Sequence, residues 1–394
     1  MKNFFKTGLE LMLKNLSRKI LNKSNAEIIG VTGSVGKSST KEAIFKVLNE
    51  SQKYKNRVAK SEGNLNNEIG LPLSILGFKR SPKWYEIFSY MYNVYIRANY
   101  KNTNPLKDKA ILVLEYAADK PGDMDYLVSI AKPKIAIITK ISPAHLELFG
   151  TIDNVIKEKG RIAEILSSDG TLFLNKDDKN SSLLAKKTSA KVIYFKDTGL
   201  NLYREIAENV GKYYEISNGE IKKALYDFKL PAGRLSIFSG IKNSTIIDSS
   251  YNASPDAVKL TLNFLRNYNN SGRKVAILGD MRELGEFSEK AHKGIAYEII
   301  ENADVAILIG PQMQKWVKPI LDENHFINRS FINFRDAKSY IVSSVKENDI
   351  ILVKGSQNTL CLERVVELLL KNKNDIQSLC RRGSGWDKIR KRTL

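Results

Sequence analysis

Short apolar segments alternate with helical patterns along almost the whole chain, and this alternation limits the fold more than any other feature of the sequence. Segments such as AILVLE (110–115), KIAIIT (134–139) and DIILVKG (349–355) are nearly continuous apolar runs, which is typical of strands buried on both faces. Each is followed by a stretch in which apolar residues recur at helical spacing. The alternation predicts an α/β fold with parallel sheets covered by helices on both faces.

Proline and glycine interrupt this pattern at FKLPAGRLSIFSG (228–240), which predicts a domain boundary. The 394 residues are enough for two domains, each with its own core. In the first, residues 81–104 are aromatic and amphipathic and predict a helix before a polar loop. The basic end of the chain has no apolar periodicity, so we expect a mobile tail there. We divide the chain into a basic amphipathic helix (1–24), a nucleotide-binding domain (25–232), a second α/β domain (233–375) and a basic tail (376–394).

The chain is strongly basic, with 63 Lys and Arg against 43 Asp and Glu and a formal net charge of +20. This balance suits an anionic partner, namely a nucleotide, a nucleotide-sugar, a nucleic acid or an acidic membrane surface. The charge is scattered and no nucleic-acid recognition module is visible, so we expect no nucleic-acid partner. Cys361 and Cys380 are too few for a disulfide framework or a four-thiolate metal site, and a cytoplasmic location is the simplest inference.

Residues 1–24 combine apolar positions at helical spacing, among them Leu9, Leu13 and Ile20, with lysines between them. Charges interrupt the apolar positions, so the segment matches neither a signal peptide nor a bilayer-spanning helix. Two interpretations are open. The helix makes a peripheral contact with a membrane surface, or it packs on the domain behind it, which we favour.

The string GVTGSVGKSSTKE lies between an apolar strand and an amphipathic helix, the setting of a phosphate-binding loop. Backbone N–H groups and the helix N-terminus of such a loop surround a phosphate, and glycines allow its close approach. Gly33 and Gly36 suit this purpose, with Lys37 reaching the outer phosphates and the Ser38 hydroxyl available to Mg²⁺. The general pattern G-x-x-x-x-G-K-[ST] would require a glycine where this chain has Val31.

Two further residues follow strands of the first domain. Glu115 ends one strand and His145 follows the next, and the carboxyl ends of parallel strands are where ligands gather. Glu115 would add a carboxylate to an Mg²⁺ site, with a solvated strand-end glutamate as the alternative. A lone histidine is more often structural, and Lys159 by itself would be one of many lysines on a helix surface.

Several ordered blocks, roughly over residues 26–370, resemble the Mur ligase family, whose phosphate loop keeps the shorter spacing found here. Besides that loop, the first domain contains NLNNEIGLPLSIL, VLEYAADKPGDMDYLV and ISPAHLELFGTIDNVIKEKGRI. The second contains IIDSSYNASPDAV, VAILGDMRELGE and ILVKGSQNTLCLERVVELL. The motifs NNEIG, SYNA, LGDMRELG and LVKGS are most similar to the branch that adds D-alanyl-D-alanine to a muramoyl-tripeptide.

The resemblance implies a P-loop ATPase domain with a parallel sheet, followed by a Rossmann-like C-terminal domain. It also implies an ADP-forming ligase that uses ATP and Mg²⁺. ATP phosphorylates a substrate carboxylate, and an incoming amine attacks the acyl phosphate. The implied substrates are D-alanyl-D-alanine and a muramoyl-peptide precursor of the cell wall.

The resemblance also carries residue roles over to this chain. Catalysis would involve Lys37, Lys159, His145 and Arg234, and Lys159 matches a lysine that many members carbamylate with CO₂. Ser38, Glu115 and His145 would hold the metal. Nucleotide contacts are expected from Gly33, Ser34, Gly36, Lys37, Ser38, Ser39, Asn67, Arg234, Asp248, Tyr251 and Asn252, with Asn66 beside Asn67 and with Lys354 and Ser356 facing the site.

The sequence departs from this branch in three places. Only residues 1–25 precede the first strand, where the branch has a domain that holds the uridine nucleotide. The Gly-His-Asn segment of the family is replaced by residues 199–214, and Ser249 and Ser254 stand where the branch has Asp and Asn. A partner protein or segment 77–109 would supply the missing contacts, or the acceptor is a lipid-linked muropeptide, a folate or a polyamino acid. A non-catalytic nucleotide-binding subunit is a further alternative.

Overall fold

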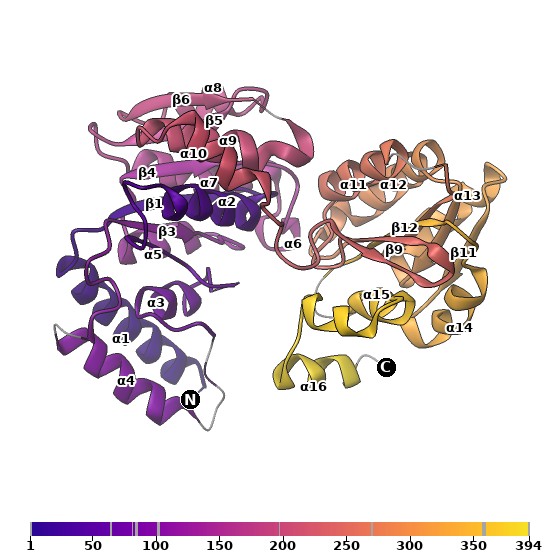
Figure 1. Cartoon of the computed structure of the whole chain (residues 1–394), viewed down its shortest axis with the longest axis horizontal. Coiled ribbons are helices and arrows are strands. Elements are labelled where there is room, and N and C mark those ends of the chain that lie inside the picture. Colours follow the sequence, from indigo (N-terminus) through magenta and orange to yellow (C-terminus); the bar gives the residue numbers. More distant parts are fainter. Residues whose placement is uncertain are drawn as a thin grey trace. The chain divides into compact units, whose positions relative to one another are not determined.

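The computed structural model describes residues 2–392, apart from 64, 81, 83–85, 101–102, 197, 269–270 and 357–359. The chain forms two compact units (Figure 1). The first consists of Met1–Ser142 and Thr151–Phe228, and the second of Pro143–Gly150 and Lys229–Leu394. The short segment between the two parts of the first unit therefore belongs with the second.

A six-stranded parallel sheet forms the centre of the first unit. Its strands are short, and the central ones are almost entirely buried, as their continuous apolar sequences predict, while the two edge strands are partly exposed. The strand order reverses at strand Glu27–Thr32, which precedes the glycine loop. Ligands of open α/β sheets bind beyond the carboxyl ends of the strands where the order reverses. In spatial order the strands are β2 (Val58–Lys60), β3 (Ile111–Glu115), β1 (Glu27–Thr32), β4 (Ile135–Ile138), β5 (Thr171–Asn175) and β6 (Lys191–Phe195).

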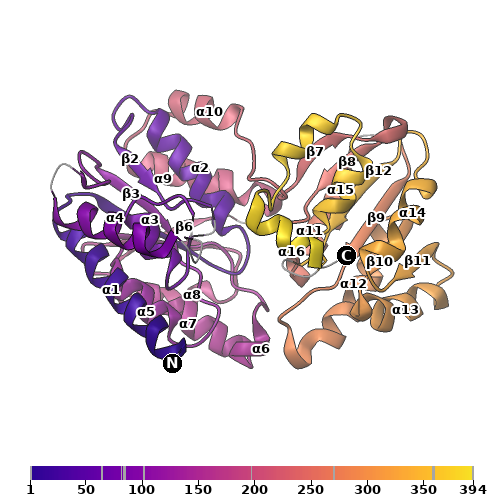
Figure 2. The same ribbon diagram turned by 90° about the horizontal axis from the view of Figure 1, so that it is seen from below.

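Helices cover both faces of this sheet, which confirms the predicted layering (Figure 2). The buried residues of these helices pack on the strands or on neighbouring helices, and their burial holds the three layers together. On one face lie α2 (Lys37–Glu50), α9 (Leu202–Tyr213) and α10 (Asn218–Tyr226), and on the other α5 (Asp123–Ile130), α7 (Ile152–Glu164) and α8 (Ser181–Ala185).

The N-terminal helix α1 (Lys2–Asn22) packs on the first unit, against α3 (Gly70–Ile75), α4 (Ile87–Asn99) and α5. Leu13 and Ile20 are buried there, and Lys19 Nζ donates to Asn99 Oδ1 at 2.6 Å. These contacts favour a packed helix over one that lies on a membrane. None of the described helices combines the length and apolar character needed to cross a bilayer.

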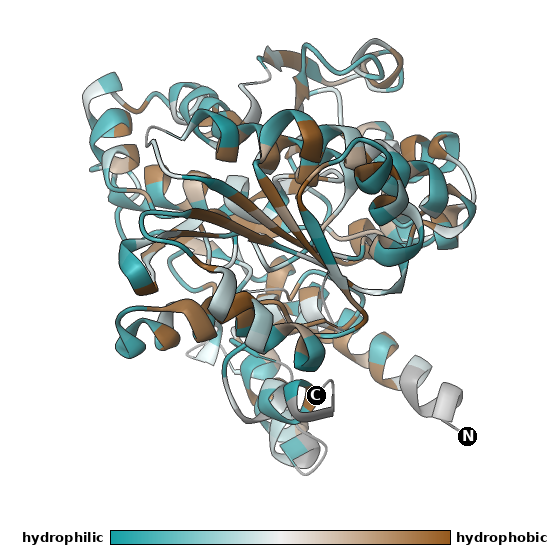
Figure 3. Cartoon of the chain, turned by 90° about the vertical axis from the view of Figure 1, so that its right-hand side faces the viewer, coloured by the Kyte–Doolittle hydropathy of each residue, from teal (hydrophilic) through white to brown (hydrophobic). Residues whose placement is uncertain are grey.

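The second unit has its own six-stranded sheet, parallel except for one edge strand. Hydrophobic residues are concentrated on the strands, while the helices alternate between hydrophobic and hydrophilic positions (Figure 3). In spatial order the strands are β11 (Asn328–Phe331), β10 (Val305–Ile309), β9 (Lys274–Gly279), β12 (Ile350–Lys354), β8 (Thr245–Asp248) and β7 (Ser236–Ser239). One core contains α11 (Pro255–Asn267), α12 (Ser288–Asn302) and α13 (Lys318–Glu323), and the other α14 (Phe334–Ser344) and α15 (Glu363–Leu369).

The C-terminal segment differs from the mobile tail expected from its sequence. Residues Ser384–Arg392 form helix α16, and Leu379 is buried in the core beside α15. Arginine–glutamate ion pairs hold much of this segment, and such pairs leave no apolar periodicity in the sequence.

Candidate functional site

The loop between β1 and α2 is shaped by two glycines. Gly33 has a φ of 138° and Gly36 a φ of 89°, conformations that residues with a side chain rarely adopt. A Cβ at Gly33 would overlap Thr139 Oγ1, because the segment after β4 lies directly against the loop. The N–H of Ser34 donates to the Lys140 carbonyl in that segment at 2.7 Å. The loop is therefore preformed and braced by the neighbouring strand.

Helix α2 begins directly after this loop at Lys37. Its N-cap residue is Gly36, which has no side chain to cap the helix. The N–H groups at a helix N-terminus, together with the helix dipole, favour an anion. Lys37 Nζ donates to the Gly33 carbonyl at 2.8 Å and so lies across the loop, with Ser38 half-buried and Ser39 buried beside it. The loop thus has the charge and shape for phosphate.

Ser34, a predicted nucleotide contact, also holds the loop in place. Its hydroxyl donates to the Ser142 carbonyl at 2.9 Å and accepts the Ser142 N–H at 3.0 Å. The side chain therefore joins the loop to the segment after β4.

Glu115, at the carboxyl end of β3, has one carboxylate oxygen that fits a cation. The side chain is 2% exposed, and Oε1 accepts from Asn66 Nδ2 at 2.9 Å. Oε2 is buried and has no hydrogen-bond donor among the described residues. Such an oxygen is costly to bury unless a cation satisfies it. Mg²⁺ commonly binds through one or two carboxylates plus phosphate oxygens and water, so Glu115 and the Ser38 hydroxyl fit this ion.

Lys41 lies beside Glu115, and the sequence analysis missed it. It is 1% exposed, its Nζ donates to the Ser61 carbonyl at 2.7 Å, and the same atom is 4.0 Å from Glu115 Oε2. Its only signal in the sequence is its position one helical turn after Lys37. The side-chain oxygen of Asn67, a predicted nucleotide contact, accepts from the N–H of Gly70, where α3 begins.

Lys159 is fully buried on α7 rather than on the helix surface. Its Nζ donates to the Ala118 carbonyl at 2.9 Å. Burial, and secondly the charge of Lys37, lower the pKa of Lys159 to about 7. The preceding residue, Glu158, accepts the N–H groups of Gly122 and Met124 and so holds the turn that follows Ala118. The amine is therefore partly neutral near pH 7 and fixed in place.

His145 belongs to the second unit, as part of segment 143–150. Its Nδ1 lies 2.7 Å from Glu283 Oε2, and the N–H of Glu147 donates to the Glu283 carbonyl at 3.1 Å. The contact with His145 lowers the pKa of Glu283. The structure therefore gives His145 a carboxylate partner that the sequence did not indicate.

The predicted residues of the second unit gather at the carboxyl ends of β8 and β12. Asp248 is fully buried, with Oδ1 accepting the Ser250 N–H at 3.0 Å, and burial raises the pKa of Asp248. Lys354 Nζ donates to the Asn252 carbonyl at 2.9 Å and to Ser249 Oγ at 3.2 Å. Burial lowers the pKa of Lys354 to about 7.

Arg234 and Tyr251 stack on each other close to these strand ends. The Arg234 guanidinium carbon lies 4.3 Å from the centre of the Tyr251 ring. The N–H of Tyr251 donates to the Gly233 carbonyl at 3.0 Å, which ties the two segments together. Ser356 lies nearby, where its hydroxyl donates to the Ala253 carbonyl. The second unit thus collects every residue predicted for it around one loop.

A strand, a glycine loop and a helix, with a buried glutamate at the end of the neighbouring strand and a buried lysine on a helix that packs on the same sheet, define a P-loop nucleotide-binding α/β protein. Residues 31–237 match the Mur ligase middle domain, and residues 233–357 match the Mur ligase glutamate ligase domain. The chain belongs to the Mur ligase family, and it is an ADP-forming ligase.

Curated relatives match most of the chain. The UDP-N-acetylmuramoyl-tripeptide–D-alanyl-D-alanine ligase of Bacillus subtilis is 28% identical over 397 residues, which cover 91% of this chain and 79% of that protein. The enzyme of the same name from Borreliella burgdorferi is also 28% identical and covers 91% and 77%.

Solved structures share the fold. MurF from Acinetobacter baumannii aligns with a TM-score of 0.74 at 20% identity, over 91% of this chain and 80% of that one. MurF from Thermotoga maritima in complex with ADP aligns with a TM-score of 0.71 at 23% identity, over 97% and 84%. FolC of Escherichia coli in complex with DHPP and ADP aligns at 0.62 and 14% identity, over 90% and 92%.

Proposed function

We propose that this chain forms an amide bond between D-alanyl-D-alanine and the tripeptide of a UDP-muramoyl precursor, at the expense of ATP. The chemistry is supported by three features of one unit: the P loop, the buried oxygen of Glu115 that accepts no hydrogen bond from the described residues, and the buried amine of Lys159. The names of the relatives that match about nine tenths of the chain support this choice of substrates.

The reaction has two steps. The terminal carboxylate of the tripeptide attacks the γ-phosphorus of ATP, which forms an acyl phosphate and releases ADP. The amine of the dipeptide then attacks the acyl carbon, the C–O bond to phosphate breaks, and the amine loses a proton. The products are the amide, ADP and inorganic phosphate.

Residues of the first unit are proposed to position the phosphates. The N–H groups at the start of α2 and the Lys37 ammonium bind the outer phosphates, where negative charge accumulates in the transition state. Ser38 and Glu115 are the proposed ligands of Mg²⁺, which neutralises part of that charge. Asn66 orients Glu115 through its hydrogen bond to Oε1.

Lys159 is proposed to carry a carbamate. The ammonium first loses one proton, and the neutral amine then adds CO₂ and loses a second proton, which turns a cation into an anion able to support a metal. The lowered pKa of Lys159 supplies the neutral amine near pH 7. Protein incubated with ¹³C-bicarbonate should give a carbamate carbon signal that is absent from Lys159→Met, and its absence from the unaltered protein would remove this part of the proposal.

In the second unit we propose that Arg234, Asp248, Tyr251 and Asn252 contact the nucleotide. The resemblance to the family supports a phosphate contact for Arg234, which stacks on Tyr251. His145, paired with Glu283, is kept as a proposed ligand of a second metal ion.

The decisive experiment supplies ATP, Mg²⁺, D-alanyl-D-alanine and UDP-muramoyl-tripeptide, and follows phosphate release and product mass. A mass gain equal to the dipeptide less water supports the proposal. ADP binding without product would favour a different acceptor, namely a lipid-linked muropeptide, a folate or a polyamino acid. Nucleotide binding without turnover on any of them would instead indicate a non-catalytic subunit.

Two hypotheses about partners can also be tested. Product formation by the isolated chain would make a partner protein unnecessary for holding the UDP-sugar. Flotation with anionic liposomes tests peripheral membrane contact through residues 1–24, and the burial of Leu13 and Ile20 argues against it.

A further inference from the structure

The loop after β8, residues 249–253, is held by side chains and not by regular secondary structure. Backbone carbonyls need hydrogen-bond donors when they are buried, and here the donors come from two distant segments. They are Arg381 for Ser250 (3.2 Å) and Tyr251, Lys354 for Asn252 (2.9 Å) and Ser356 for Ala253 (3.2 Å).

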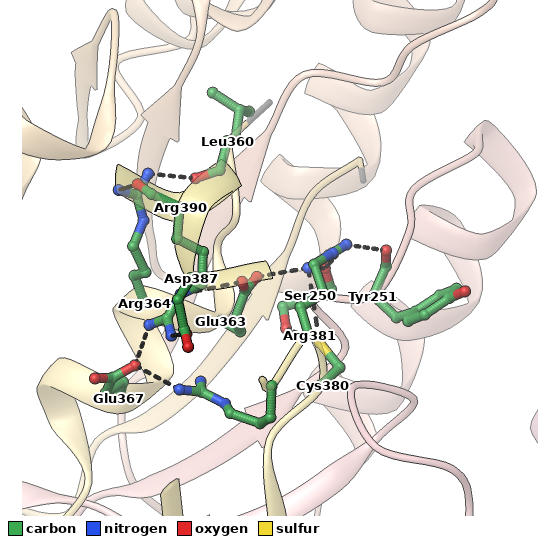
Figure 4. Close-up of polar contacts among 11 residues, drawn as sticks. Ser250, Tyr251, Leu360, Glu363, Arg364, Glu367, Cys380, Arg381, Asp387 and Arg390 are labelled. Carbon is green, nitrogen blue, oxygen red and sulfur yellow. Dashed lines mark hydrogen bonds and ion pairs between the residues drawn. The ribbon is translucent and has the colours of Figure 1, made fainter. Parts of the chain in front are cut away.

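Arg381 is the donor that comes from the C-terminal segment. Its side chain is 1% exposed, and Nη1 lies 2.5 Å from Oε2 of Glu363, which is fully buried on α15. Both Nη atoms also face the Ser250 carbonyl, so the guanidinium lies between the carboxylate and the loop (Figure 4). A planar guanidinium presents its donors to both partners in a fixed fork, a geometry that an ammonium lacks.

Further ion pairs fasten the C-terminal segment to α15. Arg382 Nη1 lies 3.0 Å from Glu367 Oε2, and Arg390 of α16 also donates to Glu367. Arg364 Nη1 in turn donates to the Arg390 carbonyl at 3.1 Å (Figure 4). Because Arg382 and Arg390 both bind Glu367, the segment that carries Arg381 is fixed to α15.

The same contacts reach Arg234 and Tyr251. The Arg381 guanidinium lies 5.5 Å from the Tyr251 ring centre, and Arg234 lies 4.3 Å from that centre. Gly233, directly before Arg234, packs so closely on Cys380 that an added Cβ would be 2.8 Å from the sulfur. The side chain of Cys380, next to Arg381, therefore lies against the turn that carries Arg234.

We propose that Arg381 is a positioning residue for the nucleotide: it fixes loop 249–253 and thereby holds Tyr251 and Arg234 in their binding positions. This rests on the proposed function, in that the loop is taken to contact ATP. It also extends the functional part of the chain beyond residue 357, where the family match ends.

The test compares Arg381→Gln with the control Lys388→Gln, which changes an exposed lysine of α16. We expect Arg381→Gln to raise the Kd for Mg-ADP and the KM for ATP by about tenfold or more, since small displacements of binding groups are costly. The KM for the dipeptide should stay the same, a split that general loosening of the protein would not produce. Lys388→Gln should bind ADP like the unaltered protein. Unchanged ADP affinity in Arg381→Gln overturns the proposal.

If Arg381→Gln fails to fold, Arg381→Lys is measured in its place. It keeps a cation beside Glu363 but loses the planar fork, so we expect a folded protein with weakened ADP binding, and unaltered affinity counts against the proposal.

A second test uses the unaltered protein and needs no substitution. ADP should slow amide exchange in both 249–253 and 379–382, and protection of the loop alone would overturn the proposal.

These measurements separate this inference from the proposed function. ADP affinity does not depend on the acceptor, so an unaltered protein that binds ADP without adding the dipeptide would correct the substrates only. Loss of ADP affinity in Arg381→Gln would still support the positioning role.

Discussion

The ammonium of Lys37 acts electrostatically on the buried amine of Lys159, and together with burial it lowers the pKa of Lys159 to about 7. The two lysines come from different helices, α2 and α7, which lie on opposite faces of the sheet. Two cations are unfavourable neighbours unless one loses its charge, and a neutral amine is what reaction with CO₂ requires. This relationship makes Lys159 the most informative residue to change.

Lys159→Met should lower the ligation rate by about a hundredfold or more, because a charged group near the transferred phosphoryl group would be lost. ADP binding should change little. Lys157→Met, an exposed lysine on the same helix, is the matched control. Measuring kcat and ADP affinity for both variants checks this, and normal turnover in Lys159→Met would refute a role for the amine.

Glu115→Gln should weaken the binding of Mg²⁺ at the P loop. The amide keeps the size of the side chain but removes the charge that a divalent cation requires, so we expect kcat/KM to fall by about a hundredfold. The apparent Mg²⁺ affinity should fall with it. Glu50→Gln, at the exposed end of α2, is the control. A Mg²⁺ titration that is identical in Glu115→Gln and the unaltered protein would exclude Glu115 as a ligand.

Gly33→Ala should abolish nucleotide binding or unfold the loop. The added Cβ meets Thr139 Oγ1, and the φ of 138° is one that alanine avoids. Gly219→Ala is the contrasting change, since a Cβ there meets nothing within 4 Å and the residue lies in α10. Thermal unfolding with and without ADP distinguishes the two, and ADP stabilisation retained in Gly33→Ala would contradict this account of the loop.

Lys354 predicts a specific dependence of stability on pH. Its pKa is about 7 in the folded chain and 10.5 when unperturbed, so between these values the unfolded chain binds more protons and stability rises with pH. Relative to Lys354→Met, the free energy of unfolding should therefore rise by about 1 kcal/mol per pH unit from pH 7 toward 10. Urea unfolding at several pH values measures this. Lys338→Met, an exposed lysine, is the control, and a flat difference for Lys354→Met would show that the amine stays charged when folded.

Much of the architecture was predictable because its signals are local. The apolar strands and the helices between them, the boundary near residue 230 and the P loop all depend on residues close together in the chain. The alternation therefore predicted two α/β units, and the loop string predicted the place of Lys37 and Ser38 at the start of α2.

The sequence by itself determined the order of strands and helices, the phosphate loop and the family, since each is expressed in short contiguous patterns. Only the tertiary structure decided that Lys159 is buried, that Lys41 lies beside Glu115, that His145 pairs with Glu283 and that Arg381 supports the loop at Tyr251. These properties depend on burial and on charges that come from distant parts of the chain. A lysine on a helix surface and a buried lysine with a lowered pKa have the same letter in the sequence, and only packing distinguishes them.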